Sequence, residues 1–125
     1  MKLFANTVYI KVFSNRFELR QIETGKSISI TSSNSFTTTR LLVGQFTEAL
    51  ESCKNGMKQL HERKWFSPSP IVIIHPMEKI ETGLSEVEVR ILKELAVGAG
   101  ARKSTVWVGH ELSDQEVMSK LLIAE

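Results

Sequence analysis

The sequence predicts a single α/β domain built on a mixed five-stranded sheet. Three observations lead to this fold class: strand-like alternation in the N-terminal quarter, a change to helical periodicity near residue 37, and two later apolar runs that alternate with helix-start signals. The 125 residues are enough for one domain, 1–125, with its own core. The content of 42% hydrophobic and 24% charged residues is typical of a folded globular chain.

The first three elements are predicted to be strands joined by tight turns. Thr7–Phe13, Arg16–Ile22 and Lys26–Thr31 are rich in β-branched and aromatic residues, and the second and third alternate with period two. Between them, Ser14-Asn15 and Glu23-Thr24-Gly25 supply turn-forming residues. An antiparallel meander is therefore expected.

A long helix is predicted next, from about Thr37 to Arg63, followed by a buried strand. Its apolar stripe has helical spacing and consists of Leu42, Phe46, Ala49, Leu50, Cys53, Met57 and Leu60. Pro68 and Pro70 end this segment. The wholly apolar run Ile71–Ile74 suits a parallel strand that is covered on both faces.

Two capping boxes mark the starts of the last two helices. Ser85 with Glu88, and later Ser113 with Glu116, have the spacing that lets a serine oxygen and a glutamate satisfy backbone donors reciprocally. Ser104–Gly109 is a predicted strand between these helices. The resulting order is β-β-β-α-β-α-β-α, and strands joined through helices should be parallel with right-handed crossovers.

Composition narrows the function classes. The net charge of +2 gives no reason to expect a nucleic-acid partner, and the single Cys53 suits a reducing compartment. With no long apolar run, a cytoplasmic protein without an integral membrane segment is expected. Of the 14 acidic residues only Asp114 is an aspartate, which disfavours most phosphate-handling and metal-dependent sites.

The middle and end of the chain resemble MreB, the bacterial actin homologue that determines rod shape. The matching stretches are Leu60–Arg63 through Phe66-Ser67-Pro68-Ser69-Pro70-Ile71-Val72-Ile73, then Gly83–Arg90, then Gly98-Ala99-Gly100-Ala101-Arg102-Lys103. The similarity covers about Leu60–Glu111. It implies the ribonuclease H-like half of an actin-like ATPase, with sheet order 3-2-1-4-5.

The departures from the MreB pattern shape the expected function. No aspartate precedes Asp114, so the N-terminal hairpin has no Asp-x-Gly phosphate motif, and the second half of an actin-like ATPase is missing. We expect a catalytically inactive, MreB-like protein-binding or assembly module without a cofactor, connected with cell shape or the cytoskeleton. The alternative is a nucleotide-binding or hydrolytic domain that is completed by dimerisation or by a partner chain.

Three residues are weak candidates for a site. Glu88 matches the family glutamate thought to position the attacking water, but the capping box is the favoured explanation, because a lone glutamate without phosphate loops has nothing to act on. His75 and His110 each follow a predicted parallel strand, at the edge where α/β sheets usually bind ligands, yet both also suit ordinary loop positions. The histidines are not spaced as metal ligands, so no metal site is expected.

Association with a protein partner or as a homodimer is also expected. The surface that a second half would cover includes the edge where the parallel strands end and the last helix. Its apolar residues are Leu112, Val117, Leu121, Leu122 and Ile123.

Overall fold

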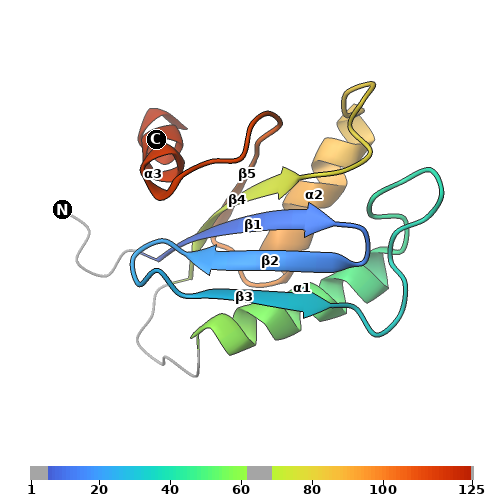
Figure 1. Ribbon diagram of the computed structural model, residues 1–125, viewed down its shortest axis with the longest axis horizontal. Coiled ribbons are helices and arrows are strands. Elements are labelled where there is room, and N and C mark those ends of the chain that lie inside the picture. Colours follow the sequence, from blue (N-terminus) through green and yellow to red (C-terminus); the bar gives the residue numbers. More distant parts are fainter. Residues whose placement is uncertain (1–5, 62–68, 125) are drawn as a thin grey trace.

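Five strands form one mixed sheet in the order β3-β2-β1-β4-β5 (Figure 1). The computed structural model describes residues 6–61 and 69–124. The strands are β1 (Thr7–Phe13), β2 (Arg16–Gln21), β3 (Ser27–Thr31), β4 (Ile71–Pro76) and β5 (Lys103–Val106). β1, β2 and β3 are antiparallel neighbours, whereas β4 runs parallel to both β1 and β5. The predicted α/β class, element order and 3-2-1-4-5 sheet order are confirmed.

Three helices cover the two faces of this sheet. They are α1 (Phe46–His61), α2 (Glu86–Gly98) and α3 (Asp114–Ala124). Alternation along β1 directs Val8 and Ile10 into the main core beneath α1 and α2, and neighbouring Tyr9 into a smaller core beneath α3 (Figure 1). The larger core therefore fills one face and α3 closes part of the other.

The first helix begins later than predicted. α1 starts at Phe46, whereas the expected start was about Thr37, and the expected end at Arg63 lies outside the described residues. Residues 37–45 form a loop whose start is anchored by the Asn15 side chain. Its Oδ1 accepts from the N–H groups of Phe36 and Thr37, at 2.8 and 2.9 Å. Asn15 has a φ of 57°, a left-handed conformation that asparagine tolerates in turns.

The parallel strands also differ from prediction at their carboxyl ends. β4 continues to Pro76 and so includes His75, whereas β5 ends at Val106 instead of Gly109. Gly109 has a φ of +152°, and the residues after β5 turn back across the sheet edge. This turn brings the Gly109 carbonyl to His75.

The apolar side chains of the last helix pack on the chain's own sheet. Val117 is fully buried, and Leu112 and Leu121 are nearly so. Their sheet neighbours in this smaller core are Tyr9, Ile71 and Ile73. Leu112, Val117 and Leu121, which were predicted to form an association surface, are therefore packed inside the domain. The side chains of Leu122 and Ile123, predicted to belong to the same surface, lie outside the described residues. No helix within 6–61 and 69–124 is long and apolar enough to cross a membrane.

Candidate functional site

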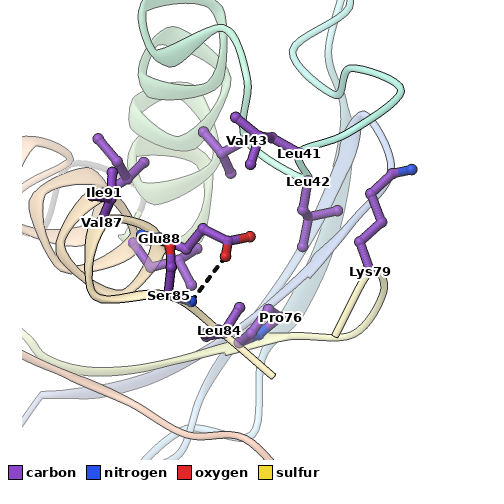
Figure 2. Close-up of a pocket in the computed structure, with 11 residues that line it drawn as sticks. Leu41, Leu42, Val43, Pro76, Lys79, Leu84, Ser85, Val87, Glu88 and Ile91 are labelled. Atoms are coloured by element: carbon purple, nitrogen blue, oxygen red, sulfur yellow. Dashed lines mark hydrogen bonds between the residues drawn. The ribbon is translucent and has the colours of Figure 1, made fainter. Parts of the chain in front are cut away.

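Glu88 lines a small apolar pocket at the carboxyl end of β4. The pocket has a volume of about 100 Å³ and lies between the 41–43 loop, Pro76 and the first turns of α2 (Figure 2). Its lining is Leu41, Leu42, Val43, Pro76, Lys79, Leu84, Ser85, Val87, Glu88, Ile91 and Leu92. Aliphatic side chains dominate this set, so the pocket suits an apolar group of a few heavy atoms.

The predicted capping box at this pocket is confirmed. The Ser85 N–H donates to Glu88 Oε1 at 2.9 Å, and the Glu88 N–H donates to Ser85 Oγ at 3.2 Å (Figure 2). The carboxylate therefore satisfies an orphan donor at the start of α2. The catalytic interpretation of Glu88 stays a prediction, and its observed bond is structural.

Two large apolar side chains stand exposed at the rim of this pocket. Leu41 is 42% exposed and Val87 is 70% exposed. Beside them, Lys79 has a φ of 59°, and its Nζ donates to the carbonyl of Thr39 at 2.9 Å. The lysine thus joins the connection after β4 to the 37–45 loop, which carries Leu41.

His75 lies on the opposite face of β4 and is nearly completely buried. It is 1% exposed, and Tyr9 beside it is 2% exposed. Nε2 lies 3.0 Å from the carbonyl oxygen of Gly109, which only accepts, so Nε2 carries the ring proton of the neutral imidazole. Nδ1 then accepts from the Tyr9 hydroxyl at 2.7 Å, and the Tyr9 oxygen accepts from the Leu112 N–H at 3.1 Å.

Burial determines the charge states of this pair. It lowers the pKa of His75 and raises the pKa of the Tyr9 hydroxyl, because both charged forms lose hydration. Both side chains are therefore neutral near pH 7. Every polar atom of the relay has a partner, so the pair is a structural link between β1, β4 and the loop after β5.

His110 is close in the fold to His75 but belongs to the surface. Its side chain is 63% exposed, and Nε2 lies 2.8 Å from Glu116 Oε2. Its ring also packs edge-on against Trp107, with centroids 5.7 Å apart. The structure brings the two histidines to the same sheet edge with separate partners, and it places Glu88 on the other face.

Two carboxylates that were not predicted as site residues join separate elements of the fold. Glu78 accepts from both the backbone N–H and the hydroxyl of Ser14, at 2.9 and 2.6 Å, in the turn between β1 and β2. Asp114 accepts from Arg20 through two bonds of 2.8 Å, which join β2 to the start of α3. These hydrogen bonds lower the pKa of both carboxyl groups.

Lys11 lies at the centre of a further charged group on the face that carries α3. Its Nζ is 2.7 Å from Glu111 and 3.3 Å from Glu18. An open groove of about 440 Å³, lined by both charged and apolar residues, runs here between β1–β3 and the loop before α3. Across residues 6–61 and 69–124, no three His, Cys, Asp or Glu side chains are grouped as metal ligands.

Comparison with known proteins identifies a relative over almost the whole chain. No protein-family model matches the sequence. The chain is 32% identical over 125 residues to the uncharacterized protein YjaA of Escherichia coli (strain K12), an alignment that covers 93% of this chain and 97% of YjaA. The chain belongs to the same family as YjaA.

Proposed function

We propose that the protein is a catalytically inactive, MreB-like module that binds another protein through the apolar pocket at the end of β4. The observation that carries this proposal is the exposure of Leu41 and Val87 beside a pocket lined almost entirely by aliphatic groups. Contiguous exposed apolar surface on a folded protein commonly marks a site of interaction with another protein. The resemblance to MreB suggests a partner connected with cell shape or the cytoskeleton.

The turn between β1 and β2 supports the absence of hydrolysis. In an actin-like ATPase, this hairpin would meet phosphate. Here its N–H and hydroxyl at Ser14 are bonded to the protein's own Glu78 carboxylate. A phosphate would have to displace that carboxylate, and the one aspartate of the sequence, Asp114, is already bonded to Arg20.

The alternative, a nucleotide domain completed by a second chain, is supported by one feature. Glu88 lines a pocket at the carboxyl end of a parallel strand, where ligands of α/β proteins commonly bind. The lining provides few polar groups for a phosphate chain, and the Glu88 carboxylate is bonded to Ser85. We therefore favour the protein-binding function.

Matched charge substitutions on α2 test the pocket. Val87 and Val97 are both exposed, at 70% and 52%, but only Val87 lines the pocket. Val87→Glu should reduce the protein captured from its own cells, or the association seen by light scattering across a concentration series, at least tenfold. Val97→Glu should leave both unchanged. Equal behaviour of the two variants, with the wild-type fold retained, would contradict the proposal.

A further inference from the structure

A buried relay ties the 107–113 loop to the sheet, in addition to the ion pairs Lys11–Glu111 and Arg20–Asp114 and the apolar packing of α3. It runs from the Leu112 N–H to the Tyr9 oxygen, from the Tyr9 hydroxyl to His75 Nδ1, and from His75 Nε2 to the Gly109 carbonyl. Two ends of the relay therefore belong to the loop, and its middle belongs to β1 and β4.

The relay tolerates only a neutral imidazole. A second proton would sit on Nδ1 and remove the acceptor that the Tyr9 hydroxyl uses. Tyr9 could then accept from His75 and Leu112, but its own proton would have no acceptor in a site that is 1–2% exposed. An unsatisfied buried donor and a buried charge both oppose this state.

The charged groups around His75 do little to offset that cost. On β1, Lys11 repels an imidazolium, and its ammonium is already paired with Glu18 of β2 and Glu111 of the loop. On the loop, Glu111 attracts an imidazolium whereas His110, once charged, would repel it. On α3, Glu116 is bonded to His110 and to the Ser113 N–H.

We propose that His75 is a pH-sensitive latch, and that its protonation releases the 107–113 loop and α3 from the sheet. Release hydrates the imidazolium and frees Tyr9 and the Gly109 carbonyl to bond with water. It also uncovers the apolar surface beneath α3, formed by Tyr9, Ile71 and Ile73. The latch is independent of the pocket, which lies on the other face of β4.

The size of the effect follows from proton uptake. The latched state resists protonation, while the released state has an ordinary histidine pKa of about 6.5. The released fraction should therefore rise as pH falls below 6.5, by up to about 30-fold at pH 5.

Amide hydrogen exchange of the full-length protein tests the latch. The protection factor of the Leu112 amide, corrected for intrinsic exchange, should fall by up to about 25-fold between pH 7 and 5. The Leu19 amide in β2 should change much less. Long-range ¹H–¹⁵N spectra of the imidazole should show the neutral Nε2–H tautomer at pH 7, and protonation of His75 at lower pH should be accompanied by loss of Leu112 protection. A Leu112 amide that stays protected while His75 titrates would overturn the proposal.

Two variants separate His75 from its neighbour. His75→Asn retains an acceptor for Tyr9 without a titrating group, so the pH dependence of Leu112 protection should disappear. His110→Asn removes the exposed loop histidine and should retain the wild-type fall. An unchanged fall in His75→Asn would also overturn the proposal. If His75→Asn does not fold, the comparison of His75 protonation with Leu112 protection in the wild type still decides.

Discussion

Several polar side chains in this protein bond to backbone that lies far away in sequence. Asn15 holds the loop at Phe36 and Thr37, and His75 holds the carbonyl of Gly109. Glu78 binds Ser14 in the same way. Sequence alone predicts that asparagine favours a turn and that a histidine ends a strand. It does not reveal these partners, because sheet pairing places them together.

Substitutions of the two residues of the α2 capping box should lower the free energy of unfolding by different amounts. Ser85→Ala should lower the free energy of unfolding by about 0.5–2 kcal/mol, since the Glu88 N–H loses its acceptor. Glu88→Gln should cost little, because an amide oxygen can still accept from the Ser85 N–H. Urea unfolding measures both. A change in partner binding by folded Glu88→Gln would instead reveal a functional carboxylate.

One buried histidine, His75, and one half-buried histidine, His61, predict a loss of stability at acid pH. Burial lowers the pKa of His61 and of His75, so the unfolded chain binds more protons than the folded chain below about pH 6.5. Their contribution is present above that pH and is lost as the pH falls below it. The carboxyl groups with lowered pKa, such as Glu78, lose their contribution only near and below pH 4.5.

Urea midpoints at pH 7 and pH 5 measure this loss. The wild-type midpoint should be lower at pH 5, and His61→Asn and His75→Asn should each reduce the difference. A midpoint that does not change between these pH values would show that neither histidine takes up protons on unfolding.

At the scale of elements, local signals predicted the helices and strands well. Both capping boxes are present, at Ser85 with Glu88 and at Ser113 with Glu116. The wholly apolar Ile71–Ile74 lies in a buried central strand. The errors occur where tertiary contacts set a boundary: the late start of α1, and the early end of β5 before the turn at Gly109.

The turn at Gly109 gives a prediction for the loop that carries the relay. Gly109 has a φ of +152°, and a Cβ there would lie 2.7 Å from the Trp107 ring. Gly109→Ala should therefore cost more than about 1 kcal/mol. Gly100→Ala is the matched control: φ is +118°, but a Cβ meets nothing within 4 Å. Thermal unfolding should show a larger loss for Gly109→Ala, and equal losses would exclude the Trp107 contact as a cause.

At the scale of the molecule, the fold class and sheet order followed from the sequence, but the location of the candidate site did not. His75 and His110 were predicted to follow neighbouring parallel strands, and Glu88 was predicted to lie at the start of a helix. In the structure His75 lies within β4, His110 follows β5, and Glu88 lies in the first turn of α2. Alternation along β4 then divides them between the two faces, because Pro76 lines the pocket with Glu88 while His75 faces Tyr9. Leu41 and Val87 were not predicted to lie together, because it is the loop anchored by Asn15 that places Leu41 beside the Val87 end of α2.

The purified protein is expected to hydrolyse neither ATP nor GTP. The hairpin donors at Ser14 are bonded to Glu78, and the Glu88 carboxylate is bonded to the backbone of Ser85. Phosphate release with Mg²⁺ should equal the background without protein. Turnover that disappears in Glu88→Ala would show that the carboxylate is catalytic.

Thermal unfolding with and without Mg-ATP tests most directly whether the strand-end edge is a nucleotide site. A ligand that binds only the folded state stabilises it by about 2.7 kcal/mol at 100 times its Kd, which raises the Tm of a domain of this size by several degrees. A protein-binding module in which Ser14 is bonded to Glu78, and Glu88 to Ser85, should show the same Tm in millimolar Mg-ATP as in buffer with Mg²⁺ alone. A Tm that rises with ATP concentration, and rises less in Glu88→Gln, would contradict the account.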